Sequence, residues 1–179
     1  MTYHAPVKQL RFALEAVANL PRLFGNSAYG ELSADLVDAV LEEAGRFAGE
    51  VIAPLNRTAD KEGARLENGK VLLPSGFDAA YKKFVANGWN AITGPAEFGG
   101  QAMPHAVGIA VQEMWQSASM AFGLCPLLSQ GAIEALTVHG TPEQKRLYLP
   151  KLVAGTWTGT MNLTEPQAGS DVGALKSKA

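Results

Sequence analysis

The chain has 179 residues, of which 47% are hydrophobic, and a formal net charge of −2 at pH 7. This composition excludes an intrinsically disordered chain and is typical of a domain with a packed core. The near-neutral charge gives no electrostatic reason to expect binding to nucleic acid or to an anionic membrane. No apolar run approaches the ~18–20 residues that span a bilayer, so we expect no membrane span.

The chain offers few residues for metal or thiol chemistry. Its single cysteine, Cys125, cannot form an internal disulfide, which favours a reducing compartment, and we expect a cytoplasmic protein. The first six residues lack the basic start and apolar stretch of a secretory signal. Three histidines lie far apart, so no metal site is predicted.

Residues 1–32 are predicted to form a helical extension and a linker. Pro6 suits a first helical position, and an apolar stripe follows at helical spacing. The stripe consists of Val7, Leu10, Leu14 and Val17. The pair Leu20–Pro21 is expected to end this helix, and the glycines and polar residues after it are typical of a linker.

Residues 33–155 are predicted to form a helical domain. Its first helix has Ser33 as N-cap and is expected to stop at Pro54. The pair Asn68-Gly69 favours a short hairpin. A second helix, capped by Ser75, is expected to end at Gly88.

Three further helices complete this predicted domain, at about 104–119, at about 126–139 and after Thr141. The last has a full start signal, with Thr141 as N-cap, Pro142 at the first position and Gln144 three residues after the cap. We expect Pro150 to kink this helix and Gly155 to end it.

The pattern changes after Gly155. Residues 156–164 are rich in β-branched and aromatic side chains, which favours a strand. The fold class is therefore mainly α, with a helical domain over 33–155 followed by the start of an incomplete β domain over 156–179. So short a segment cannot close a sheet.

The segment 160–171 carries the residues most suited to binding. Pro166 favours a turn, Gly169 permits a close backbone approach, and Thr164 and Ser170 supply hydroxyls. A strand that ends in such a turn can direct N–H groups at a heterocycle or a phosphate. The residues alone equally allow an ordinary turn whose hydroxyls bond their own backbone.

Three motifs in order resemble the acyl-CoA dehydrogenase family. Residues 163–171 (LTEPQAGSD) resemble its first signature, 94–100 (GPAEFGG) its Pro-Glu-x-x-Gly-Gly loop, and 140–150 (GTPEQKRLYLP) a helix of the same domain. The segment from Tyr3 to Leu14 is similar to the extra segment of a longer branch, which includes enzymes similar to 3-(methylthio)propanoyl-CoA dehydrogenase.

The resemblance implies an FAD site in the segment after the helical domain. The implied cofactor-binding positions are Met161, Asn162, Leu163, Thr164, Gly169 and Ser170. Thr164 matches a threonine that hydrogen-bonds the pyrimidine side of the flavin, and Ser170 also matches a serine that contacts the acyl-CoA substrate. Asn162 departs from the cysteine or small residue of many members, and alternation along a strand allows it to point away from the ring.

The resemblance also implies α,β-dehydrogenation of an acyl-CoA thioester. Its carboxylate base lies in a later helical domain of the family, so no catalytic residue is assigned here. The intact protein is expected to be a homo-oligomer that passes electrons to an electron-transfer flavoprotein. The alternatives are an acyl-CoA oxidase of the same fold or a non-catalytic helical interaction module.

An acyl-tail pocket between helices is a further expectation. Its candidate residues are apolar and come from several helices, and plain core packing explains them equally well. They are Phe98, Met103, Met114, Trp115 and Leu128.

Overall fold

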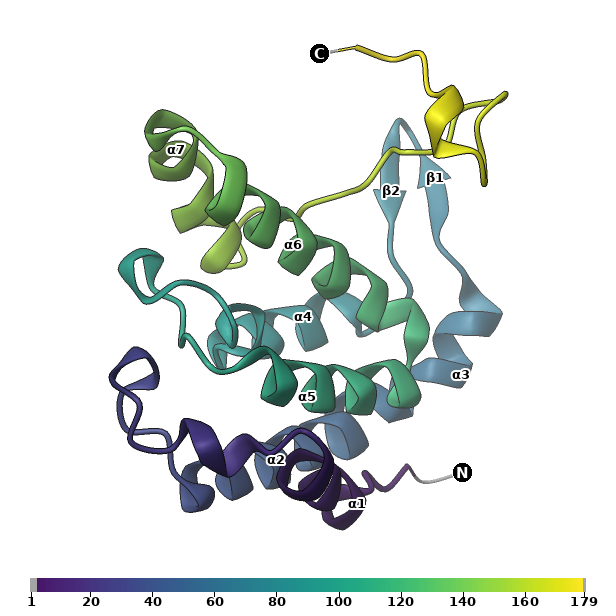
Figure 1. Ribbon diagram of the computed structural model, residues 1–179. Helices are drawn as coiled ribbons and strands as arrows, with labels where there is room; N and C mark the ends of the chain where they lie inside the picture. The colour runs from purple at the N-terminus through teal and green to yellow at the C-terminus, as the bar shows by residue number, and fades with distance from the viewer. Residues whose placement is uncertain (1–2, 179) are drawn as a thin grey trace.

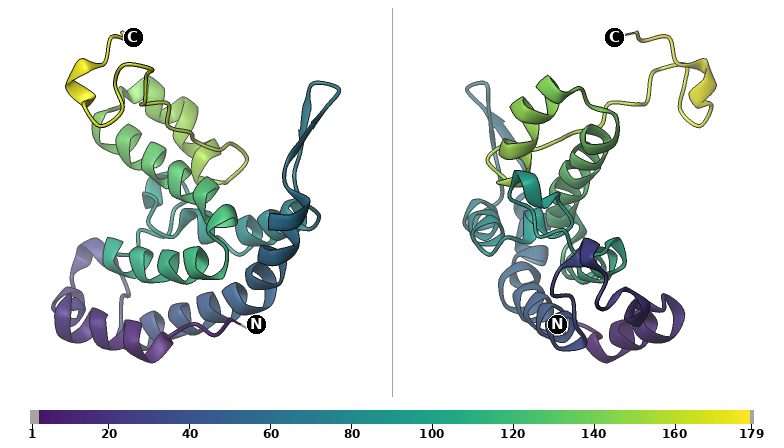
Figure 2. Two further views of the ribbon diagram at one scale, coloured as in Figure 1. Left: turned by 90° about the vertical axis from the view of Figure 1, so that its right-hand side faces the viewer. Right: turned by 60° about the vertical axis from the view of Figure 1, so that its left-hand side comes forward.

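The computed structural model describes residues 3–178 and confirms a mainly helical fold (Figure 1). Within these residues, seven α-helices and one hairpin follow one another. They are α1 (Val7–Phe12), α2 (Ala34–Phe47), α3 (Ala53–Glu62), β1 (Arg65–Glu67), β2 (Lys70–Leu72), α4 (Phe77–Ala86), α5 (His105–Ala118), α6 (Met120–His139) and α7 (Pro142–Val153). The hairpin and the C-terminal segment project from the helical body at separate places (Figure 2).

An aromatic cluster forms the centre of the main core, where α2, α4 and α5 meet. Phe84 is fully buried, and its ring centroid lies 4.7 Å from that of Trp115 and 6.2 Å from that of Phe47. Such edge-on and tilted aromatic pairs add to the stabilisation that comes from burying their area. A second, smaller cluster joins Ile133 of α6 to Leu149 of α7. Helix α6 therefore connects two centres of packing.

The N-terminal segment lies across α2. Leu10 and Leu14 are buried, as the apolar stripe predicts, but Val17 is exposed. A Cβ atom on Gly45 would lie 3.0 Å from the Cβ of Ala5, so the glycine allows the segment to approach the helix closely. The extension is therefore packed against the helical domain.

The prediction that Pro54 stops the helix after Ser33 is wrong. A π-helical turn over Ala48–Ile52 leads from α2 directly into α3, and Pro54 lies in the first turn of α3. The missing N–H of proline costs little in a first turn, and a π-turn relaxes the hydrogen-bond ladder around it.

The predicted hairpin is confirmed. Strands β1 and β2 are antiparallel, with Leu66 opposite Val71. Asn68 and Gly69 have φ values of 52° and 74°, the left-handed pair that a tight two-residue hairpin turn requires.

Two predicted helix starts are displaced. Gly76, at φ 88°, occupies the N-cap of α4, while the N–H and hydroxyl of Ser75 donate to the Glu62 carboxylate at 2.9 and 3.1 Å. Helix α6 begins at Met120 and not near 126, because Ser119 caps it and the helix accommodates Pro126. In both places a neighbouring hydrogen bond outweighs the local residue preference.

The start of α7 matches its prediction. The Thr141 hydroxyl accepts the Gln144 N–H at 3.3 Å, and the Gln144 side chain accepts the Thr141 N–H at 2.9 Å. This reciprocal capping box satisfies two N–H groups that a helix leaves unpaired. After α7 the chain turns at Gly155, with φ 69°.

The strand predicted over 156–164 is not formed in the described part of the chain. The segment is without regular hydrogen bonding until an isolated bridge joins Glu165 to Ala168. A strand needs a partner to bond its backbone groups, and these residues pair with none in the described range.

Helix α6 is the one helix in residues 3–178 that is long and apolar enough to cross a membrane by length and composition. Its most apolar stretch of 18 residues has a mean hydropathy of 1.3, and 28% of that stretch is buried. The expectation of no membrane span is thus not confirmed. An apolar helix that packs against further protein has the same composition, so this is weak evidence of a span.

Candidate functional site

The segment after Gly155 crosses α6 at one close contact. The Gly159 N–H donates to the Ser129 hydroxyl at 3.1 Å, and Ser129 is fully buried. A Cβ atom on Gly159 would lie 2.6 Å from that of Ala132, so only glycine fits without a shift. This contact anchors the chain just before the candidate flavin-binding residues.

The turn over 164–170 is closed by two backbone hydrogen bonds. The Glu165 N–H donates to the Ala168 carbonyl at 3.1 Å, and the Ala168 N–H donates back at 3.0 Å. Ala168 is buried, while Thr164 and Ser170 are exposed on the two sides of the turn. The structure thus brings these two predicted residues to one tight turn.

All six predicted cofactor-binding residues lie on this exposed segment. Five have exposed side chains: Met161, Asn162 and Leu163 just before the turn, and Thr164 and Ser170 at its two ends. Gly169 does not have a positive φ, so its conformation does not require glycine. Nothing lies within 4 Å of the position of its Cβ, which leaves the backbone accessible to a ligand.

The backbone of the turn fits the polar edge of a flavin. In the described chain, the N–H groups of Thr164, Gly169 and Ser170 donate to no other atom. Accessible N–H groups around a turn can bind heterocycle oxygens or phosphates. The residues present therefore fit the cofactor that the sequence motif implies.

Sequence reasoning missed the part that Glu165 plays. Its carboxylate accepts the Lys176 N–H at 3.0 Å, the Ser177 N–H at 2.8 Å and the Gln167 amide. Hydrogen bonds from the Ser177 side chain and from these backbone groups lower the pKa of Glu165 to about 2. The sequence signal for this role was a glutamate inside a turn, but its backbone partners, Lys176 and Ser177, lie 11 and 12 residues later.

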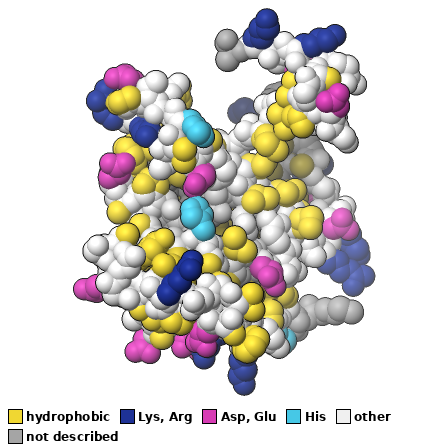
Figure 3. Space-filling view, viewed as in Figure 1, with side chains coloured by type: hydrophobic (Ala, Val, Ile, Leu, Met, Phe, Trp, Pro, Cys, Tyr) yellow, Lys and Arg dark blue, Asp and Glu magenta, His cyan; other side chains and the backbone are white. Residues whose placement is uncertain are grey.

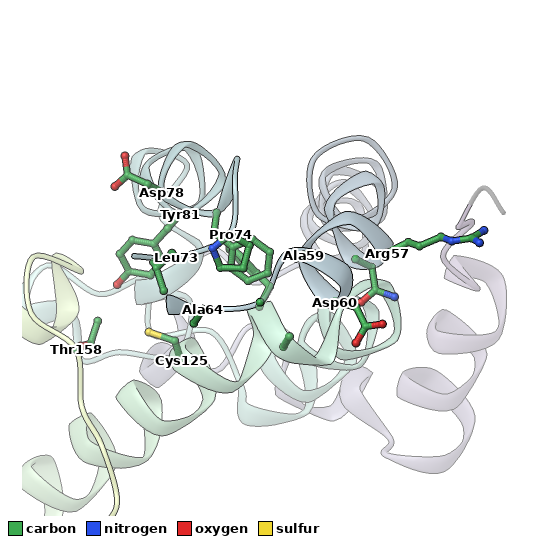
Figure 4. A pocket seen from close by; sticks show the side chains of 15 residues that line it. Arg57, Ala59, Asp60, Ala64, Leu73, Pro74, Asp78, Tyr81, Cys125 and Thr158 are labelled. Carbon is green, nitrogen blue, oxygen red and sulfur yellow. The ribbon is translucent and has the colours of Figure 1, made fainter. Parts of the chain in front are cut away.

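A cavity of about 980 Å³ lies between α3, α4 and the start of α6. Figure 4 shows Tyr81 and Cys125 on facing elements, with Thr158 beside them. Burial raises the pKa of Tyr81 to about 12 and also raises the pKa of the Cys125 thiol. Both groups are therefore neutral near pH 7, and Cys125 is not an activated nucleophile.

None of the five predicted pocket residues lines this cavity. Met114 and Trp115 are core residues with 0% and 1% exposure, so the packing explanation holds for them. Met103 packs against the same core, and Phe98 packs against the smaller cluster. Leu128 is partly buried, and its carbonyl lies beneath Gly159.

Helix α6 presents an apolar surface outside the cavity. Met120, Leu124 and Leu127 are 64%, 48% and 38% exposed. Figure 3 shows hydrophobic side chains reaching the surface on one face of the molecule, among them those of the C-terminal segment. Large apolar side chains gathered in this way mark a surface for a ligand or for further protein.

The histidines do not assemble a site. His105 lies 3.6 Å from Glu134 at the surface, between α5 and α6. In residues 3–178, no group of three or more His, Cys, Asp or Glu side chains is placed to hold a metal ion.

Comparison with known proteins identifies the family of the helical domain. Residues 35–156 match the family described as "Acyl-CoA dehydrogenase, N-terminal domain". The chain is 52% identical over 179 residues to 3-methylmercaptopropionyl-CoA dehydrogenase of Ruegeria pomeroyi, covering 100% of this chain and 30% of that protein. It is 30% identical to a butyryl-CoA dehydrogenase of Syntrophomonas wolfei, covering 98% and 29%.

A solved structure shares the fold. A chain from the structure "Electron transferring flavoprotein of Acidaminococcus fermentans" matches with a TM-score of 0.64 at 23% identity, over 82% of this chain and 36% of that one. The chain spans about 30% of the length of the first curated relatives. The three motifs, the helical architecture and these matches agree, and the chain belongs to the acyl-CoA dehydrogenase family, with that family's N-terminal helical domain over residues 35–156.

Proposed function

We propose that the intact protein is an FAD-dependent acyl-CoA dehydrogenase, to which this chain supplies the helical domain and the first flavin-contacting segment. FAD, when bound, accepts the hydride that leaves the β carbon of the acyl group. One observation carries the proposal: a family-matched helical domain leads directly into an exposed turn whose free N–H groups suit a flavin edge.

The role of the turn is to bind and orient. The Thr164 hydroxyl and N–H offer a donor and an acceptor to the pyrimidine side of the ring. Gly169 lets the ligand approach the backbone, and Ser170 offers its hydroxyl to the cofactor or to the acyl-CoA. No carboxylate of this chain is assigned as the base that removes the α proton.

We further propose that the acyl tail lies against the exposed apolar face of α6. The exposed side chains of Leu124 and Leu127 form part of this face, and Gly131 leaves open space on the same helix. Burying an alkyl chain on such a surface is favourable by about 0.8 kcal/mol per CH₂ group. The contact between Gly159 and Ser129 attaches the segment that leads to the turn to this same helix.

The family resemblance supports proposals for the electron acceptor and the assembly state, and the cysteine content supports one for the compartment. We propose an electron-transfer flavoprotein as the partner, a homo-oligomer as the assembly and the cytoplasm as the location. The single cysteine is consistent with a reducing compartment.

Turnover by the full-length protein tests the proposal. The protein should convert a saturated acyl-CoA to the 2-enoyl-CoA while reducing an artificial electron acceptor, and it should form little H₂O₂ in air. Stoichiometric H₂O₂ would show the oxidase instead. Absence of both bound flavin and enoyl product would overturn the proposal in favour of a helical interaction module.

A further inference from the structure

We infer that Glu165 is a positioning residue of the flavin site, a clasp that joins the turn over 164–170 to the backbone at Lys176 and Ser177. The inference rests on the proposed function, because it concerns the same site. It adds a part for a side chain that need not touch the cofactor or the substrate.

The geometry of the clasp is specific. One carboxylate oxygen, Oε2, accepts the Lys176 N–H at 3.0 Å, and the other, Oε1, accepts the Ser177 N–H at 2.8 Å. The Gln167 amide also donates to Oε2 and reaches toward the Ala174 carbonyl at 3.5 Å. A single side chain thus connects three points of the segment 165–177.

The clasp closes a loop that contains residues proposed to bind FAD. Thr164 lies immediately before it, and Gly169 and Ser170 lie inside the loop that it closes. Without the clasp, the turn is held by the two backbone hydrogen bonds between Glu165 and Ala168. After the turn, the Gly173 N–H donates to the Asp171 side chain at 3.1 Å. None of these bonds crosses from the turn to residues 176–177.

The consequence is preorganisation. A flexible turn must lose conformational freedom when it binds a ligand, and that loss weakens affinity. Hydrogen bonds from N–H groups to an ionised acceptor are stronger than those between neutral groups. Glu165 fixes the loop before FAD arrives, so its removal should weaken FAD binding more than it weakens the fold.

The test uses the full-length protein with four sequences: wild type, Glu165→Ala, Glu165→Gln and the control Glu143→Gln. Glu143 is an exposed glutamate in the first turn of α7 that pairs with Arg146 at 3.4 Å. The FAD dissociation constant is measured by flavin fluorescence on the apoprotein, with the thermal midpoint of each apoprotein and kcat at saturating FAD.

We expect Glu165→Ala to weaken FAD binding about tenfold, and Glu165→Gln, which keeps one acceptor oxygen, about threefold. The thermal midpoint of both Glu165 variants should stay near wild type, and Glu143→Gln should change neither FAD affinity, midpoint nor kcat. An equal loss of midpoint in both Glu165 variants without a change in FAD affinity would overturn the inference. So would FAD binding by Glu165→Ala within twofold of wild type.

Amide hydrogen exchange separates the inference from the proposed function. Exchange at Lys176 and Ser177 should accelerate in Glu165→Ala, whether or not the protein binds flavin. If wild type binds no FAD but exchange accelerates, the proposed function fails while the clasp stands. If wild type binds FAD but exchange is unchanged in Glu165→Ala, the clasp is wrong while the proposed function stands.

Discussion

Single polar residues connect parts of this chain that lie far apart in sequence. Asn90 is 2% exposed, and its amide nitrogen donates to the carbonyls of Leu152 and Val153 at 2.6 and 3.2 Å. These carbonyls belong to the last turn of α7, where a helix leaves its acceptors unpaired. Asn90 therefore holds the end of α7 against the loop that precedes α5.

Replacing Asn90 by alanine should lower the free energy of unfolding by about 1–3 kcal/mol, because the Val153 carbonyl loses its donor and the Leu152 carbonyl loses its side-chain donor but keeps the Gly155 N–H. Urea denaturation of the chain measures the change. Asn87 is exposed and lies three residues earlier, so Asn87→Ala is the matched control and should have little effect. Equal effects of the two variants would show that the buried amide has no special role.

Glu165 gives the turn a defined pH dependence. Its pKa falls from its usual 4.5 to about 2 in the folded chain, so the ionised form is the one that the fold favours. The hydrogen bonds it accepts are fully present above pH 4.5 and are lost as the pH falls through about 2. The amide protons of Lys176 and Ser177, followed by NMR, should lose protection in that window. Protection that does not change across it, or that changes equally in Glu165→Gln, would contradict this.

At the scale of elements, two helical glycines have opposite surroundings. A Cβ on Gly131 of α6 would meet nothing within 4 Å, whereas one on Gly108 of α5 would lie 2.4 Å from Cγ2 of Thr93. Gly131→Ala should raise the free energy of unfolding by about 0.5–1 kcal/mol, because alanine favours helix over glycine. Gly108→Ala should lower it by about 1–3 kcal/mol through overpacking. Chemical denaturation of the pair tests both, and the same sign for the two would contradict the packing described.

The capping box of α7 offers a second test of an element. Thr141→Ala removes the hydroxyl that accepts the Gln144 N–H and should cost about 1 kcal/mol. Thr141→Ser keeps the hydroxyl and should be close to wild type. Differential scanning calorimetry compares the two, and equal midpoints would mean that the box contributes nothing.

The sequence predicted elements best where the signal is local. The Asn68-Gly69 hairpin and the Thr141 capping box depend on neighbouring residues, and both are confirmed. The helix end predicted at Pro54 is wrong because a π-turn accommodates the proline. The cap predicted at Ser75 is wrong because this residue hydrogen-bonds the Glu62 carboxylate instead. The strand after Gly155 could not form without a partner.

The candidate site was predictable only in part. The segment 161–170 was located by its resemblance to a family motif, and the structure shows it exposed and turned. The clasp at Glu165 and the anchor between Gly159 and Ser129 join residues that are 11 to 30 positions apart. Periodicity and turn propensity describe near neighbours, so they do not reveal such pairs.

At the scale of the molecule, the chain holds a helical body and an exposed turn that we propose to be one edge of a flavin site. Residues 1–179 alone should retain little FAD, because contacts from one segment do not offset the entropy of holding a large cofactor. Purification of this chain with added FAD, followed by gel filtration and a visible spectrum, checks the prediction. Stoichiometric flavin that survives gel filtration would mean that the helical body contributes much more of the site than the exposed turn.

Flavin bleaching in the full-length protein tests the central claim most directly. The oxidised protein is mixed with saturated acyl-CoA substrates of increasing chain length in the absence of oxygen, and the visible flavin band is followed. The account predicts that at least one substrate bleaches the bound flavin rapidly and yields one enoyl-CoA per flavin. A protein that binds FAD but is bleached by none of them, or that binds no FAD, would contradict it.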